Sequence, residues 1–421
     1  MINEEKIVIE KAILVGLNAD VFTKEETATE QTLDELEALL ETAGGECVGR
    51  VLQNRHTPDP HSFLGEGKVE ELRQLVETTE ANLLVFDNPL SPSQIRALEE
   101  LSGTTVLDRS ALILDIFAQR AKTREGRLQV ELAQYKYLLP RLSGMGRSMS
   151  RLGGGIGTRG PGETKLETDR RHIRERINRL QQELTELRRV RSVQRERRIR
   201  NSVPVVAIVG YTNAGKSTLL NHLTNAGIPA NNRLFDTLDT TTRQLKVSDT
   251  LDVLLSDTVG FIAKLPHNLV EAFKATLEEL QYADLLLHVI DAGDPHREDH
   301  IAVVDKLITQ LAKPETPIIR CYNKADTIDE DDLPRDREMV AISAKTGFGM
   351  DALMQAIEKA LDRGMYHTTF LLPYSMAGQV DQLHTLAKVI RCDYLSEGIE
   401  IEVICDEICY GRLRNYEKKG E

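Results

Sequence analysis

An eight-residue stretch near the middle of the chain places two glycines, a lysine and a serine at a fixed spacing. It reads G-x-x-x-x-G-K-S and comprises Gly210, Tyr211, Thr212, Asn213, Ala214, Gly215, Lys216 and Ser217. Glycines at these positions let backbone N–H groups turn towards phosphate oxygens. The lysine can reach the β- and γ-phosphates, and the serine hydroxyl can bind Mg²⁺. The alternative is an ordinary glycine turn between a strand and a helix.

The flanking residues decide between these two interpretations. Residues 203–209 are apolar and β-branched, which predicts a buried strand, and residues 218–222 have the composition of a helix start. A helix that begins directly after a glycine loop points its N–H groups and its positive dipole end at a bound anion. The sequence therefore predicts a phosphate-binding loop with Lys216 as a catalytic residue.

A second motif, D-x-x-G, follows the next predicted buried strand. It consists of Asp257, Thr258, Val259 and Gly260. We expect the aspartate to hold Mg²⁺ through water and the glycine N–H to contact the γ-phosphate, a contact that hydrolysis removes. The next residue is Phe261, where signalling GTPases often carry a glutamine that orients the attacking water. Because a phenyl ring cannot orient water, we expect slow hydrolysis by the isolated protein.

Two further motifs lie at later strand ends and predict guanine specificity. The first is N-K-x-D, formed by Asn323, Lys324, Ala325 and Asp326, and the second is formed by Ser343, Ala344 and Lys345. The Asp326 carboxylate can accept the ring N–H and the exocyclic amine of guanine, a pair of donors that adenine lacks. We expect Lys324 to lie along the base and a backbone N–H of the second motif to bind the guanine carbonyl. Each motif alone could be an ordinary loop, but their shared order predicts GTP or GDP as the ligand.

The segment 234–243 lies between the phosphate-binding loop and the D-x-x-G motif. This position predicts a switch loop that closes on Mg²⁺ with a threonine. Spacing alone leaves four candidates open, which are Thr237, Thr240, Thr241 and Thr242.

The predicted fold class is α/β, in four parts. Strands at 12–17, 47–52, 83–86 and 105–107 alternate with helices at 32–42, 69–78 and 93–101, which predicts an α/β domain with a mainly parallel sheet over residues 1–109. Residues 201–364 form a doubly wound nucleotide-binding domain with strands at 203–209, 251–256, 285–290, 318–322 and 339–342. Residues 365–421 are expected to form a small α+β unit.

Residues 110–200 are expected to form an antiparallel helical hairpin. Leucines and other apolar residues recur at spacings of three and four around 128–142 and again around 173–187. The connecting segment 143–162 contains eight glycines, Arg147, Arg151 and Arg159, and no acidic residue. It is either a flexible linker or a tip that contacts RNA phosphates. Its G-x-G-x-x-G at 155–160 lacks the preceding strand that a dinucleotide site requires.

Charge is distributed unevenly along the chain. The 421 residues carry a net charge of −13, yet residues 170–200 hold twelve arginines against four acidic residues. A solvated helix face is the alternative, but the local reversal favours an RNA-facing surface. Five cysteines without a metal-binding pattern are expected to be reduced. With no signal peptide and no apolar run long enough to span a membrane, a cytoplasmic location is expected. A monomer is also expected.

Taken together, these motifs resemble the HflX family of ribosome-associated GTPases over nearly the whole chain. The most specific resemblance is the stretch G-T-R-G-P-G-E-T-K-L-E-T-D-R-R at 157–171, directly upstream of the nucleotide-binding domain. The family's switch pattern F-x-T-L-D is similar to the stretch formed by Phe235, Asp236, Thr237, Leu238 and Asp239, with Thr240 where the family usually has proline. The resemblance therefore implies Thr237 as the Mg²⁺ ligand beside Ser217.

The resemblance also implies a function. The N-terminal domain and hairpin would enter the large ribosomal subunit, and GTP would drive the splitting of stalled or idle ribosomes, often under stress. Some members of the family also hydrolyse ATP. Two other functions remain open: a nucleotide-sensing module that occupies ribosomes for silencing or assembly without splitting them, and an ATP-driven RNA remodeller.

Overall fold

The computed structural model describes residues 9–24, 26–142, 161–200, 203–224, 227, 234–235, 241–248, 251–265, 280–329, 333, 339–361 and 365–418. The chain divides into two compact units. The first comprises Met1–Thr185, Asn231–Asp239 and Val259–Ala275, and the second comprises Glu186–Ala230, Thr240–Thr258 and Thr276–Glu421. The four predicted domain boundaries remain a prediction.

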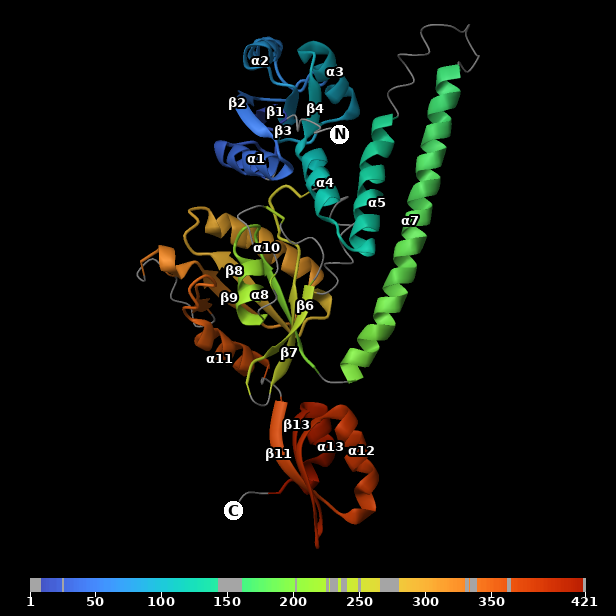
Figure 1. Ribbon diagram of the computed structural model, residues 1–421, viewed down its shortest axis with the longest axis vertical. Helices are drawn as coiled ribbons and strands as arrows, with labels where there is room; N and C mark the ends of the chain where they lie inside the picture. Colours follow the sequence, from blue (N-terminus) through green and yellow to red (C-terminus); the bar gives the residue numbers. More distant parts are fainter. Residues whose placement is uncertain are drawn as a thin grey trace, which may run out of the picture. The chain divides into compact units, whose positions relative to one another are not determined.

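The first unit contains a four-stranded parallel sheet in the order β2-β1-β3-β4. Its elements are β1 (Lys11–Ala19), α1 (Glu30–Ala43), β2 (Glu46–Arg55), α2 (Glu66–Thr79), β3 (Leu83–Phe86), α3 (Pro92–Ser102), β4 (Thr105–Asp108) and α4 (Arg109–Arg120). Apolar side chains on alternate positions of β1 pack with α2 and α3, whereas α1 packs with α4 (Figure 1). All four predicted strands and all three predicted helices of this region are present.

Two long helices follow, α5 (Arg124–Arg141) and α7 (Pro161–Arg200). Arg176 of α7 donates two hydrogen bonds to Glu131 of α5 at 2.8 and 2.9 Å, and Arg124 of α5 lies 3.5 Å from Glu183 of α7. Because the later residue of α7 pairs with the earlier residue of α5, the two helices run antiparallel (Figure 1). Helix α5 ends one residue after Pro140, where the sequence predicts a bend or an end. Residues 143–160 of the predicted loop at 143–162 lie outside the described residues, whereas residues 161 and 162 belong to α7 instead.

The second unit contains a six-stranded sheet in the order β10-β9-β8-β5-β7-β6. Its elements are β5 (Val205–Gly210), α8 (Lys216–Thr224), β6 (Thr241–Lys246), β7 (Asp252–Asp257), β8 (Leu285–Asp291), α10 (Arg297–Leu311), β9 (Ile318–Asn323), β10 (Met339–Ala341) and α11 (Met350–Leu361). Helices α8 and α11 pack on one face and α10 packs on apolar residues of β8 and β9. The predicted mixed α/β class with a mainly parallel sheet is confirmed.

Strand β6 differs from the sequence-based expectation. Thr241, Thr242 and Arg243 were predicted to belong to the switch loop, but they begin an edge strand that pairs antiparallel with β7. Burial along residues 241–246 does not alternate as in a typical strand: two half-buried residues are followed by two exposed, one buried and one exposed residue. Backbone pairing with β7, rather than hydrophobic patterning, therefore forms this strand, and local sequence does not reveal it.

The same unit also contains a three-stranded antiparallel sheet in the order β11-β13-β12. Its elements are β11 (Met365–Leu372), α12 (Ala377–Leu386), β12 (Lys388–Leu395), β13 (Gly398–Asp406) and α13 (Glu407–Leu413). Phe370, Ile401 and Val403 are fully buried and pack with apolar residues of both helices. Among the described residues, no helix combines the length and the apolar character that crossing a membrane requires.

Candidate functional site

Strand β5 ends in the phosphate-binding motif at a backbone geometry that only glycine tolerates. Gly210 has a φ of +155°, and a Cβ atom there would lie 2.2 Å from the carbonyl oxygen of Val289 on β8. Gly215 has a φ of +94°, and a Cβ atom there would lie 2.2 Å from the side-chain nitrogen of Asn323. Contacts below 3 Å force the neighbouring atom to shift, and here that atom is a backbone carbonyl at Gly210 and, at Gly215, an amide held by two hydrogen bonds. Both glycines of the motif are therefore favoured by close approach.

Lys216 is the first residue of α8 and is 5% exposed. Its Nζ donates a 2.7 Å hydrogen bond to the carbonyl oxygen of Tyr211, inside the same loop. Burial lowers the pKa of Lys216 to about 8, and the negative charge of Asp257 opposes this shift. The ammonium is therefore already held against the loop backbone, at the helix N-terminus where a phosphate would bind.

The predicted Mg²⁺ ligands Ser217 and Asp257 are brought together by the sheet. Asp257 ends β7, which pairs with β5, and its side chain is fully buried. The Ser217 hydroxyl donates a 3.2 Å hydrogen bond to Asp257 Oδ2. The hydroxyl of the next residue, Thr258, donates a 2.7 Å hydrogen bond to the carbonyl of Ile208 on β5. This bond fixes the chain where it leaves β7. A hydroxyl beside a carboxylate offers the oxygen ligands that Mg²⁺ prefers, so this donor set fits the ion.

The Asn323 side chain connects the phosphate-binding loop to the last motif. Its amide nitrogen donates to the carbonyl of Ala214 at 2.8 Å, and its oxygen accepts from the Ala344 N–H at 2.9 Å. The residue is 2% exposed. These two bonds leave one N–H and one lone pair of the amide, so a contact of Asn323 with guanine within the N-K-x-D motif stays a prediction. Asn323 therefore links the phosphate-binding loop at Ala214 to the loop at Ala344.

The remaining residues of the two guanine motifs occupy the neighbouring strand ends. Asp326 is exposed in a short 3₁₀ turn (Ala325–Thr327), and Lys324 Nζ contacts Asp291 Oδ2 at 2.6 Å. Ser343 and Ala344 are buried, whereas Lys345 is exposed. Since β9 and β10 are paired in parallel, both motifs emerge at one edge of the sheet. These site assignments remain predictions.

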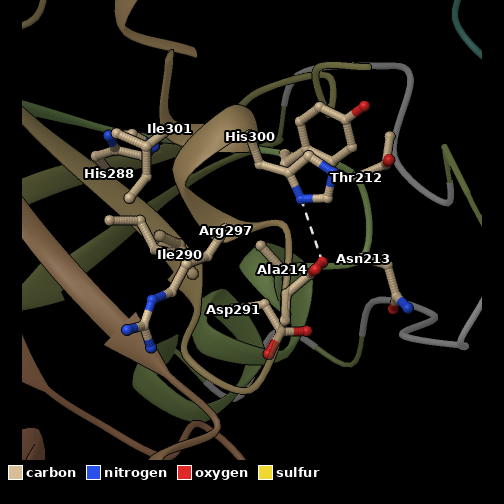
Figure 2. Close-up of a pocket in the computed structure, with 12 residues that line it drawn as sticks. Thr212, Asn213, Ala214, His288, Ile290, Asp291, Arg297, His300 and Ile301 are labelled. Atoms are coloured by element: carbon tan, nitrogen blue, oxygen red, sulfur yellow. Dashed lines mark ion pairs between the residues drawn. The ribbon is translucent and has the colours of Figure 1, made fainter. Parts of the chain in front are cut away.

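A small cavity of about 60 Å³ adjoins the phosphate-binding loop (Figure 2). It is lined by residues 211–214, the end of β8 and the start of α10, and it does not include Lys216 or Ser217. In it, the His300 imidazole stacks on the Tyr211 ring with centroids 3.7 Å apart and planes 8° apart. The His300 Nδ1 lies 3.2 Å from Asp294 Oδ2, the contact dashed in Figure 2. The stacked Tyr211 and His300 rings therefore tie the phosphate-binding loop to α10 beside this cavity.

The sequence interpretation missed His300, Asp294 and Asp291. Asp291 could have been found, because it ends β8 as the other motif residues end their strands. His300 lies inside a helix and belongs to no motif, so only the fold reveals its stacking on Tyr211.

The D-x-x-G motif is divided between the two units. Asp257 and Thr258 belong to the second unit, whereas Val259 and Gly260 belong to the first. Both of the latter are buried, and so is Phe261 at 2% exposure. Phe235 is also buried in the first unit. The predicted switch residues Asp236, Thr237, Leu238, Asp239 and Thr240 lie outside the described residues.

Comparison with known proteins places the whole arrangement in one family. Three family models match in sequence along the chain: a GTP-binding GTPase N-terminal region at residues 30–118, a GTP-binding GTPase middle region at 120–198, and a 50S ribosome-binding GTPase at 205–324. GTPase HflX of Caldanaerobacter subterraneus subsp. tengcongensis is 49% identical over 97% of this chain and 94% of its own length. The chain belongs to the HflX family. GTPase HflX of Escherichia coli (strain K12) is 45% identical over 86% of each chain.

Membership in the HflX family confirms the predicted enzyme class, a P-loop GTP hydrolase that binds GTP and GDP. Among solved structures, a GTP-binding protein from the hyperthermophilic archaeon Sulfolobus solfataricus in complex with GDP is similar to this chain. It is 23% identical, covers 84% of this chain and 99% of its own, and superposes with a TM-score of 0.43.

Proposed function

We propose that this HflX-family GTPase binds the large ribosomal subunit and, in its GTP-bound form, splits or rescues stalled or idle ribosomes. The observation that carries the proposal is the match of residues 205–324 to the family described as 50S ribosome-binding GTPase. The arginine-rich helix α7 adds to it, because twelve arginines against four acidic residues within 170–200 suit an RNA backbone in a chain of net charge −13.

In this proposal, the protein contacts the phosphates, the guanine base and the Mg²⁺ ion of the bound nucleotide. Backbone N–H groups of residues 210–215 and the Lys216 ammonium bind the phosphates, and Asp326 accepts from the guanine base. Ser217 and Thr237 would ligate Mg²⁺, with Asp257 holding it through water. The ion would neutralise charge that develops on the phosphates during hydrolysis. The N–H of Gly260 would contact the γ-phosphate only before hydrolysis.

Contact with ribosomal RNA would use the hairpin. Arg147, Arg151 and Arg159 between α5 and α7 would contact phosphates, since a guanidinium can bind them bidentately. GTP binding would favour the ribosome-bound form of the protein, and hydrolysis would release the protein from the ribosome.

The second candidate function is a nucleotide-sensing module that occupies the large subunit for silencing or assembly. It uses the same GTP site and the same arginines, and differs only in leaving the two ribosomal subunits joined. Competition between GTP and ATP in the same assay tests the remaining alternative, an ATP-driven RNA remodeller, because the proposed contact of Asp326 favours guanine.

Sucrose-gradient sedimentation of intact ribosomes separates these functions. With GTP or a non-hydrolysable analogue, the protein should convert the intact particle into its subunits, and with GDP it should not. Lys216→Ala should abolish this effect, whereas Lys313→Ala, at an exposed position away from every motif, should not change it. Splitting that persists in Lys216→Ala would contradict the proposal. Cosedimentation with intact ribosomes in the presence of GTP would support the second candidate.

A further inference from the structure

The chain that leaves the D-x-x-G motif is anchored in the first unit by a buried lysine. Lys264 has 8% of its side chain exposed and forms an ion pair with Asp87, which follows β3 and is fully buried. The backbone of Lys264 has a φ of +57°, a left-handed conformation that a non-glycine residue adopts at a cost. Such a conformation persists where surrounding contacts impose it, and the Asp87 ion pair is a contact of this kind.

Asp87 is shared with a second cation. Arg109 Nη1 donates to Asp87 Oδ1 at 2.8 Å, the Thr32 hydroxyl donates to Asp87 Oδ2 at 2.7 Å, and Arg109 Nη2 pairs with Glu35. The arginine side chain is 3% exposed. Two cations therefore balance two anions in a buried cluster, and removing any one of them would leave an uncompensated charge.

The residue before Arg109 makes an equivalent cluster at the end of α5. Asp108 is 1% exposed and accepts hydrogen bonds from the Tyr137 hydroxyl and from Arg141 Nη2, both at 2.8 Å. It also caps α4 by accepting from the Ala111 N–H at 2.9 Å. The Arg141 guanidinium lies 3.3 Å from the centre of the Tyr137 ring. Arg141 is the last residue of α5, two residues before the glycine- and arginine-rich segment at 143–162.

A second segment from the nucleotide-binding domain's sequence packs in the same unit. The Phe235 ring meets Phe117 of α4 edge-on, with centroids 4.7 Å apart, and the Leu234 N–H donates to the Thr42 hydroxyl at 3.3 Å. Phe235 also has a left-handed φ of +57°. The start of the predicted switch loop and the segment after D-x-x-G are thus both fixed to the N-terminal sheet domain.

We propose that Asp87, Arg109 and Asp108 are positioning residues that couple the segment after the D-x-x-G motif to the end of α5. We name Lys264, Asp87, Arg109, Asp108 and Arg141 the ion-pair chain; its two sets of ion pairs are joined through the backbone between Asp108 and Arg109. Any movement of the segment after Gly260 that displaces Lys264 must either break the Lys264–Asp87 pair or move the groups bonded to it. Breaking the pair would leave a buried charge without a partner, which is strongly destabilising. Movement of the groups bonded to Lys264 is therefore favoured over breaking the pair. The meaning of this coupling for ribosome binding rests on the proposed function.

The first test uses the isolated full-length protein and measures amide hydrogen exchange at residues 135–141 with GDP and with a non-hydrolysable GTP analogue. In the wild type, exchange in this segment should differ at least fivefold between the two nucleotides, within the range of typical coupling factors. Lys264→Met and Asp87→Asn should reduce the difference to less than twofold, and Lys264→Arg should preserve it. The matched control is Arg50→Met, which removes an ion pair with Asp34 and Glu37 in the same domain but outside the chain.

Tyr137→Phe provides a milder variant, in case the charge variants fold poorly. It removes one hydrogen bond to Asp108 while keeping the ring under Arg141, so it should lower the exchange difference without unfolding the protein. The inference is overturned if the wild type shows no nucleotide-dependent exchange at 135–141, or if Lys264→Met and Tyr137→Phe both keep the full difference.

Ribosome binding provides the second readout. The ratio of ribosome affinities with the analogue and with GDP should fall towards one in Lys264→Met, whereas nucleotide affinity stays within twofold. A wild-type protein with nucleotide-dependent exchange at 135–141 but no ribosome affinity would defeat the proposed function and support the coupling. Nucleotide-dependent ribosome binding that is unchanged in Lys264→Met would defeat the coupling and support the proposed function.

Discussion

Burial of Lys216 leads to a quantitative prediction about pH. In the folded protein, burial lowers its pKa from 10.5 to about 8. In the unfolded chain, the side chain regains the ordinary pKa of a lysine. Between pH 8 and 10.5 the unfolded state therefore binds more protons than the folded state, and the free energy of unfolding rises with pH. Below pH 8 both states are protonated, so the full cost of burying the ammonium is present.

The size of this cost follows from the pKa shift. The difference of 10.5 − 8 = 2.5 pKa units corresponds to about 3 kcal/mol, at roughly 1.4 kcal/mol per unit. The hydrogen bond from the Lys216 ammonium to the Tyr211 carbonyl returns about 1.5 kcal/mol, the lower end of the range for a charged donor. Replacing Lys216 with methionine removes both contributions, so the variant should be more stable than the wild type by about 2 kcal/mol at pH 7.

The assay is urea unfolding without nucleotide from pH 7 to pH 10, followed by circular dichroism, for wild type and Lys216→Met. The stability gap at pH 7 should shrink steadily above pH 8 and vanish or reverse by pH 10. Lys313→Met, at an exposed position, should show no pH-dependent gap beyond about 0.5 kcal/mol. Parallel pH profiles for wild type and Lys216→Met would refute the assignment of Lys216 as a buried, weakly basic lysine.

Three further predictions follow, two on nucleotide affinity and one on folding stability. Bound phosphates should restore the charge of Lys216, so GDP affinity should fall by up to about tenfold per pH unit above pH 8, and calorimetry in buffers of different ionisation enthalpy should detect proton uptake. Asp326→Ala should weaken GDP binding about 100-fold, from the loss of about 3 kcal/mol of charged hydrogen bonding, with thermal stability unchanged because the side chain is exposed. Equal losses of GDP and ADP affinity in that variant would contradict guanine reading. Gly210→Ala should cost at least about 1–3 kcal/mol of folding stability from backbone strain, because its Cβ would lie 2.2 Å from the Val289 carbonyl; a denaturation midpoint equal to that of wild type would contradict this geometry.

Most of the strands and helices could be predicted because their signals are local. Buried parallel strands such as β8 are continuous apolar runs, and helices such as α3 carry their own caps, with Ser91 and Gln94 forming a capping box and Gly103 ending the helix. Strand β6 could not be predicted, because its residues form a strand only through pairing with β7. The same limit applies to the role of Asn323, whose two partners, Ala214 and Ala344, are 109 and 21 residues away.

The sequence by itself determined the chemistry: the residue types and order of the four motifs, the guanine preference that they imply, and the segregation of arginine in a chain of net charge −13. Only the tertiary structure decided which side chains act on one another. Lys264 and Asp87 are 177 residues apart, and no local pattern marks either as a partner of the other. Their pairing depends on the parallel sheet of the first unit, which buries the carboxylate after β3 and leaves two cations to compensate it. Burial and long-range pairing are properties of the packed chain, so they become visible only when the fold is known.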